Sequence, residues 1–160
     1  MLVIRQEAWD SSDETALFEI AKISFEEIDA PEKLLLLPIA DDPASPQSDH
    51  ELRARLLHAA ARSGVILAGA AEADGRLLGF IASPNGDWQS IAQTLPELTG
   101  RFADRASALD QSQRPPVVET RFGKVGLLVG DDILAPHLVR LAALAGVEIL
   151  LNPSAERSDA

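Results

Sequence analysis

The sequence predicts an α/β fold, in which helices are layered on mixed β-sheet within a single domain. Short apolar runs rich in Val, Ile and Leu alternate with amphipathic segments of helical period along the 160 residues. Turn-forming sequences at 73–76 and 83–86 separate some of these runs. Hydrophobic residues make up 46% of the chain and charged residues 24%, which is the composition of a globular protein with a buried core.

The predicted strands are runs in which apolar residues follow one another, a pattern typical of strands buried on both faces. They are 1–4, 33–38, 65–71, 77–82, 125–129 and 147–151, with a shorter strand at Val117–Thr120. The sequence Ala73-Asp74-Gly75-Arg76 predicts a hairpin between two of them, because Asp-Gly is a frequent pair in two-residue hairpin turns. Residues 83–86, Ser-Pro-Asn-Gly, predict a further turn.

Three segments have the period of amphipathic helices. They are 13–28, 49–62 and 136–145. Ser11 followed by Glu14 predicts a capping box for the first helix, and Asp49 is the predicted N-cap of the second. Pro136 suits the first turn of the third helix, and Gly146 suits its C-terminal cap.

Composition and charge exclude several classes of function. The chain has no cysteine, which rules out disulfides, thiolate metal sites, iron–sulfur clusters and a cysteine nucleophile among its residues. Its 14 basic and 25 acidic residues give a net charge of −11, so we expect no nucleic acid and no anionic membrane as partners. The longest charge-free apolar stretches, 34–40 and 64–71, are too short to span a bilayer, and we expect a cytoplasmic protein.

Polar residues follow two of the predicted strands, where α/β folds gather ligands. These residues are Asp41 and Asp42 after one strand and Asp131 and Asp132 after the other, with His137 on the helix that follows. They can form a site that holds a hard cation or activates water. The interpretation we favour is that Asp132 caps the helix, Asp131 is solvated and the other pair begins an acidic loop. No phosphate-binding or dinucleotide-binding glycine motif is present, so we predict no cofactor and no bound metal.

A segment of more than thirty residues carries a recognisable series of motifs. In order, they are GKVG at 123–126, GDD at 130–132, APH at 135–137, LAGVE at 144–148 and NPS at 152–154. Weaker matches lie upstream, in LLLLP at 34–38, LAGAAE at 67–72 and SPNG at 83–86. This series resembles the carbon–nitrogen hydrolase (nitrilase) superfamily. The resemblance implies a layered α-β-β-α sandwich, here in partial form, with mixed sheet flanked by helices.

The resemblance also implies which residues should carry catalysis. Members of the family use a cysteine thiolate as nucleophile, a glutamate as general base and a lysine that stabilises the tetrahedral intermediate. The matching positions hold Gly130 for the cysteine, Ile39 for the glutamate and Thr94 for the lysine, and His137 stands for the glutamate of the family's Pro-Glu pair. None of the first three side chains can perform the role of the residue it replaces. We therefore expect a catalytically inactive relative that acts as a binding or assembly module, to which the pattern assigns no small-molecule ligand.

The alternative is a hydrolase with re-purposed chemistry on the C–N bonds of small amides. In that case Asp131, Asp132 and His137 would hold a metal or activate water in place of the replaced triad.

The chain is also shorter than the family members that it resembles. We expect one nitrilase-like domain over residues 1–154 and a polar tail over 155–160. A partial sandwich should leave an apolar sheet face uncovered. Self-association, a completing partner chain or a rearrangement into two layers would each resolve this, and we favour a homo-oligomer because symmetric self-association is common among soluble proteins.

Overall fold

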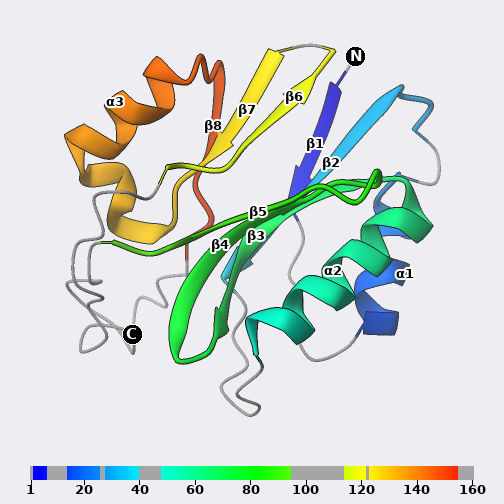
Figure 1. Ribbon diagram of the computed structural model, residues 1–160. Helices are drawn as coiled ribbons and strands as arrows, with labels where there is room; N and C mark the ends of the chain where they lie inside the picture. Colours follow the sequence, from blue (N-terminus) through cyan, green and yellow to red (C-terminus); the bar gives the residue numbers. More distant parts are fainter. Residues whose placement is uncertain are drawn as a thin grey trace, which may run out of the picture.

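The computed structural model describes residues 2–6, 14–25, 28–39, 48–94, 114–121 and 123–154. Its elements follow one another along the chain as shown in Figure 1. They are β1 (Leu2–Gln6), α1 (Glu14–Phe25), β2 (Glu32–Ile39), α2 (Asp49–Ser63), β3 (Ile66–Ala73), β4 (Arg76–Ala82), β5 (Trp88–Ala92), β6 (Val117–Thr120), β7 (Gly123–Leu127), the 3-10 helix η1 (Gly130–Leu134), α3 (Pro136–Leu144) and β8 (Ile149–Leu151).

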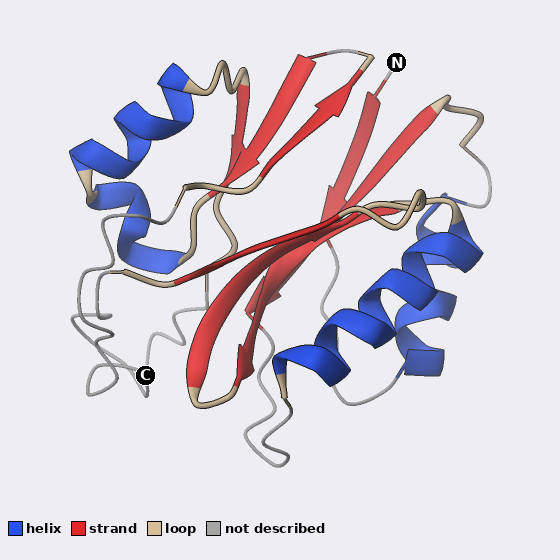
Figure 2. Cartoon of the chain, viewed as in Figure 1, coloured by secondary structure: helices blue, strands red, loops and turns tan. Residues whose placement is uncertain are grey.

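The strands form two sheets. The larger sheet has the order β1-β2-β3-β4-β5, in which β1, β2 and β3 are parallel and β4 and β5 are antiparallel additions. The smaller sheet has the order β6-β7-β8, with one antiparallel and one parallel pairing. Helices α1 and α2 cover the outer face of the larger sheet, and α3 lies on the outer side of the smaller one (Figure 2). The predicted α-β-β-α layering, with mixed sheet, is confirmed.

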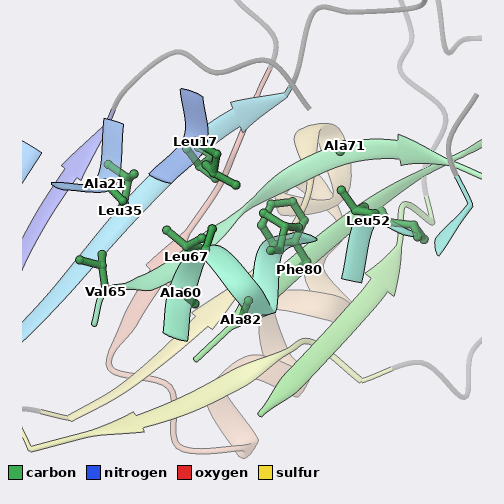
Figure 3. Packing of buried hydrophobic residues seen from close by; sticks show 14 of the residues in the cluster. Leu17, Ala21, Leu35, Leu52, Ala60, Val65, Leu67, Ala71, Phe80 and Ala82 are labelled. Atoms are coloured by element: carbon green, nitrogen blue, oxygen red, sulfur yellow. The ribbon is translucent and has the colours of Figure 1, made fainter. Parts of the chain in front are cut away.

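Both faces of the larger sheet are apolar because its central strands lie between two layers. On β2, β3 and β4, one set of alternating side chains packs against α1 and α2, and this set includes Leu35, Leu67 and Phe80 (Figure 3). The other set, which includes Leu34 and Ile81, faces the smaller sheet and meets apolar residues from β7 and β8. Continuous apolar runs are therefore what this architecture requires of its central strands.

The two sheets approach one another closely at Gly79 on β4. A Cβ atom placed there would lie 2.2 Å from Cγ2 of Val129 and 2.5 Å from Cδ2 of Leu127. Ordinary carbon–carbon contacts are about 3.5–4.0 Å. Only glycine therefore fits at this point unless neighbouring atoms move.

The helices begin and end at local sequence signals, and one of these signals differs from the prediction. The N-cap of α2 is Ser48, not Asp49: the Ser48 hydroxyl accepts from the Glu51 N–H, and the Glu51 carboxylate accepts from the Ser48 N–H at 3.1 Å. Helix α3 starts with Pro136 at its first turn, as predicted. Gly146 ends the helix as predicted: it follows Ala145 with a φ of 82°, and its N–H donates to the carbonyl of Ala143 at 3.0 Å. The predicted capping residue Ser11 lies outside the described residues.

The predicted hairpin turn is confirmed. Strands β3 and β4 pair in antiparallel fashion up to Ala73 and Arg76, and the turn residues Asp74 and Gly75 have φ values of 48° and 72°. Positive φ at both central positions is the geometry of the tight hairpin turn that Asp-Gly favours. The turn at 83–86 also forms, but it leads into β5, a strand that the sequence pattern did not predict.

The expected uncovered sheet face is not observed within the described ranges. The large hydrophobic side chains that are exposed there lie on helices: Ile23 on α1, Ile133 and Leu134 on η1, and Leu144 on α3. The inner faces of the two sheets cover one another instead. None of the helices in the described part of the chain has the length and hydrophobicity that a bilayer crossing requires.

Candidate functional site

Ile39, Thr94 and Gly130 lie at the same end of the sandwich. Strand β2 ends at Ile39, beside Ala70 near the end of β3. Strand β5 runs antiparallel to β4, so its last residues return to this end, where the Gln93 N–H donates to the carbonyl of Leu77. The close approach of Gly79 to Val129 brings the segment before Gly130 to the same place. The topology thus brings together three positions that are far apart in the sequence.

Ile39 is part of the core between the sheets. Its side chain is 4% exposed and belongs to the apolar cluster that includes Ile91 and Val129. The pairing of β2 with β3 shifts register between Leu37 and Ile39, so Pro38, which has no N–H to donate, sits at an irregularity of the strand. The shift places Ile39 on the inner face of the sheet, where a hydrocarbon side chain is stable and a carboxylate would have to be desolvated.

Gly130 is the first residue of η1 and lies in the tight turn that follows β7. Its φ is 52°, in the left-handed region that costs other residues about 1–2 kcal/mol. Its N–H donates to the carbonyl of Pro153 at 3.0 Å. The Asn152 side-chain amide donates to the carbonyls of Leu128 and Gly130, at 3.1 and 2.9 Å. The segment that follows β8 therefore holds the turn on both sides of its central residue.

Asp132 links this turn to the end of β5. The carboxylate is fully buried, and both of its oxygens accept from the Thr94 N–H, at 3.0 and 2.9 Å. The prediction that Asp132 caps the following helix is wrong: the N-cap of α3 is Ala135, and it makes no side-chain cap bond. The carboxylate instead satisfies a buried amide 38 residues away in sequence, which fixes the Thr94 position relative to Gly130.

The other polar candidates do not gather around Asp132. Asp131 is half-buried on η1, and His137 is exposed at the first turn of α3. Asp41 and Asp42 lie outside the described residues. Within the described ranges, no group of three His, Cys, Asp or Glu side chains is arranged to hold a metal ion. Asp131, Asp132 and His137 therefore do not form one shared site in the part of the chain that the structure describes.

Sequence comparison places the chain in a family. The family model for carbon–nitrogen hydrolases matches residues 2–160. The chain belongs to the carbon–nitrogen hydrolase family. Among curated proteins, the sequence gave no significant match.

Solved structures with the same fold include amidases from Nesterenkonia. An amidase from Nesterenkonia sp. superposes with a TM-score of 0.73 at 23% identity, and the match covers 99% of this chain and 65% of the amidase. A cysteine-to-serine mutant of the Nesterenkonia AN1 amidase, from the nitrilase superfamily, gives 0.74 at 24% identity, covering 99% of this chain and 66% of that one. A mutant of the amidase from Nesterenkonia sp. AN1 in complex with butyramide gives 0.72 at 23%, with coverage of 99% and 66%. This chain thus spans about two thirds of the length of these structures.

Sequence reasoning missed two sets of contacts that shape the site. The pairing of Thr94 with Asp132 could not be found, because it depends on the path of β5. Asn152 was recognised only as part of a motif, and its position directly after an apolar strand is the signal that could have indicated a half-buried amide with a structural role.

Proposed function

We propose that this chain is a carbon–nitrogen hydrolase-family protein without the family's thiol chemistry, acting as a binding or assembly module. The observation that carries the proposal is the absence of cysteine from all 160 residues, together with glycine at the turn where the resemblance places the nucleophile. Two of the related amidase structures have covalent products at an active-site cysteine, formed with fluoroacetamide and with acrylamide. No residue of this chain can form such a thioether.

Two further replacements support inactivity. The position of the general base holds Ile39, which is packed in an apolar cluster and has no group that takes a proton. The position of the lysine holds Thr94, whose backbone N–H is committed to Asp132. Loss of a nucleophile alone can lower the rate of an enzyme on the order of a million-fold.

The first experiment is an assay of ammonia release from butyramide, acrylamide, nitriles and ureido compounds. We expect no release above the rate without protein. Turnover that disappears in Asp132→Asn or His137→Ala would overturn the proposal and support a re-purposed hydrolytic site. Glu19→Gln serves as a matched control, because it removes one exposed carboxylate on α1, away from all three candidate residues.

A second experiment asks whether the turn retains the geometry of a nucleophile position. Gly130→Cys, alone and with Ile39→Glu and Thr94→Lys, is treated with fluoroacetamide, and the covalent adduct is followed by mass spectrometry. In the triple variant we expect the Cys at position 130 to react faster than one introduced by Ala143→Cys on the exposed face of α3, because a neighbouring ammonium group lowers the pKa of a thiol. Equal rates would show that the turn no longer activates a thiol.

The proposed assembly role has its own test. We expect size-exclusion chromatography with light scattering to give a mass above that of one 17.1 kDa chain, through self-association or with a completing partner chain added. A mass of one chain at high protein concentration, together with no protein captured in a lysate pull-down, would argue for a binding role without assembly.

A further inference from the structure

A cavity of about 500 Å³ lies between strand β6 and the strand ends of the larger sheet, at the end of the sandwich opposite to Gly130. Its walls come from the starts of β2, β3 and β5, from the end of β4 with the turn that follows it, and from β6. Glu32 at the cavity and Ile39 at the other end of β2 are seven residues apart, which is about 23 Å along a strand. The cavity is therefore separate from the site around Gly130.

Strand β6 is an edge strand of the smaller sheet, as the structure describes it. It pairs with β7 in antiparallel fashion, and the Leu127 N–H donates to the carbonyl of Pro116. In such a pair, the backbone groups of alternate residues point toward the partner strand and away from it. The N–H and C=O groups of residues 117, 119 and 121 therefore point away from β7.

Side chains of the larger sheet bond to two of these three residues. The Gln89 amide accepts from the N–H of Val117 at 2.8 Å and donates to its carbonyl at 2.6 Å. The Glu32 carboxylate accepts from the Arg121 N–H at 2.9 and 3.1 Å. Val117 and Arg121 are about 13 Å apart along the strand, which is close to the width of roughly 14 Å from β5 to β2 across three strand spacings. The outer edge of β6 thus crosses the ends of β2, β3, β4 and β5.

The middle residue of this edge, Glu119, lies opposite the ends of β3 and β4. It lines the cavity together with Ile66 from β3, and with Ile81 and Ser83 from β4 and the turn after it. Among the described residues, none bonds to the backbone N–H or C=O of Glu119 on this edge. The cavity therefore offers a donor and an acceptor side by side.

The hydroxyl of Ser83 is a second polar group on the wall of the cavity. Ser83 is only 6% exposed, and its hydroxyl makes no hydrogen bond within the part of the chain that the structure describes. Ile81, two residues earlier, packs in the core between the sheets, so Ser83 continues the inner face of the larger sheet toward the cavity. A buried polar group without a partner costs about 1–3 kcal/mol, so a ligand that bonds to this hydroxyl gains stability.

The ionic side chains near the cavity already have partners. The Glu119 carboxylate pairs with Lys124 at 3.1 Å on the outer face of the smaller sheet, and the Lys33 ammonium donates to a carbonyl at the end of α1 at 3.5 Å. The Glu32 carboxylate is bonded to β6 as described above, and exposed Asp87 accepts from an amide of its own turn at 2.8 Å. The free polar groups of the cavity are therefore uncharged, which favours an uncharged ligand.

We propose that this cavity binds a small uncharged cis-amide of the lactam type. Such a ligand has its N–H and C=O on one edge, as the Gln89 side chain does, and pairs with Glu119 in the way that Gln89 pairs with Val117. An open-chain secondary amide is trans and has these groups on opposite sides.

The rest of the ligand has its own contacts in the cavity. Its carbonyl has a second lone pair for the Ser83 hydroxyl, and its hydrocarbon part lies on Ile66 and Ile81. The volume of about 500 Å³ is within the range of pockets that bind small organic molecules, about 300–1,000 Å³. This inference does not depend on whether the chain is catalytically active.

The first test compares three ring compounds of similar size: δ-valerolactam, N-methyl-δ-valerolactam and cyclohexanone. Binding is followed by chemical-shift changes of backbone amides in ¹⁵N-labelled protein. We expect saturable shifts with δ-valerolactam, largest at the amide of Glu119, and binding about tenfold weaker for the two compounds that have no N–H to donate. Equal affinity for all three compounds, no saturation with δ-valerolactam, or shifts confined to Gly130 and its neighbours would overturn the proposal.

Variants at position 119 then separate the backbone from the side chain. Glu119→Pro removes an N–H that points away from β7, so no bond between β6 and β7 is lost. It should weaken δ-valerolactam binding by about tenfold, followed at the amide of Ile81. Glu119→Ala is the matched control, because it removes the exposed carboxylate and keeps the N–H, and it should leave the affinity unchanged. Equal affinities in the two variants, with the same circular dichroism, would refute the assignment.

Ser83→Ala tests the other wall, and it decides the proposal if Glu119→Pro does not fold. It should weaken δ-valerolactam binding by about threefold, because one hydrogen bond to the ligand is lost. The melting temperature of the free protein should not fall, because the hydroxyl has no partner among the described residues. Unchanged affinity would contradict a lactam seated between Ser83 and Glu119.

Discussion

Gly79 provides the sharpest test of how the two sheets pack. Replacing it by alanine places a methyl group 2.2 Å from Cγ2 of Val129 and 2.5 Å from Cδ2 of Leu127, where ordinary contacts need about 3.5–4.0 Å. Each distance falls short by about 1 Å or more, and both neighbours are fully buried. The sheets must separate, or these side chains must leave their preferred rotamers.

Overpacking of this kind costs about 1–3 kcal/mol. We expect Gly79→Ala to cost about 2–3 kcal/mol, because two buried neighbours on a second sheet must move at once. For a chain of 160 residues, each kcal/mol lowers the melting temperature by about 2–4 °C. The expected decrease is therefore about 4–12 °C, measured by circular dichroism and by urea denaturation.

Gly64→Ala is the matched control for Gly79→Ala. Gly64 has a φ of 68°, and no heavy atom lies within 4 Å of an added Cβ. Its substitution costs only the backbone conformation, about 1 kcal/mol. The double variant Gly79→Ala/Val129→Ala should be less destabilised than the sum of its single variants by about 1 kcal/mol, because removing the Val129 methyls relieves the clash. Equal losses in both alanine variants, or strict additivity in the cycle, would refute the inferred close approach.

Three further predictions concern polar contacts. Asp132→Ala should lower the free energy of unfolding by about 2–3 kcal/mol in urea titrations, because the buried N–H of Thr94 loses its acceptor, and a loss below 0.5 kcal/mol would contradict this. Asn152→Ala should cost about 2 kcal/mol for its two carbonyl partners and should speed amide hydrogen exchange in the turn that it holds. The pKa of the Glu51 carboxyl is lowered by hydrogen bonds from Ser48, of which the bond from the backbone N–H has the largest effect. The ionised carboxylate therefore stabilises the fold above the unfolded pKa of about 4.3, and this stabilisation disappears as the pH falls through the folded pKa. Glu51→Gln should therefore be less stable than the parent at pH 7, with a difference that shrinks on acidification; a difference independent of pH would count against the capping box.

The parts of the fold that could be predicted are those set by local patterns. Apolar runs such as the one in β2 and the Asp74-Gly75 turn are visible in the sequence, because burial on both faces and positive φ each select residue types directly. Strand β5 escaped because it has five residues, of which only Ile91 and Ala92 are buried, so it carries no clear period. The N-cap of α2 could have been predicted: Glu51 stands three residues after Ser48, which is the spacing of a capping box.

The candidate site was predictable in position and only partly in its contacts. The resemblance placed Ile39, Thr94 and Gly130, and the topology brings all three to one end of the sandwich. The bond between Asp132 and the Thr94 amide joins segments 38 residues apart. Such a contact depends on how two sheets stack, and local sequence around either residue contains no information about that.

The three positions that the resemblance assigns to the family's triad share a physical property. Ile39 puts hydrocarbon where a carboxylate would be desolvated, and Gly130 takes a φ of 52° that a side chain would make unfavourable. Thr94 brings no charge to a buried position, where its N–H already has an acceptor. Each residue thus suits the fold better than the catalytic residue it stands for would, since active sites hold strain and buried charge that function alone requires. Under the proposal of an inactive chain, these costs are the first that we expect to be lost, while the contacts that shape the turn, from Asp132 and Asn152, are expected to stay in place.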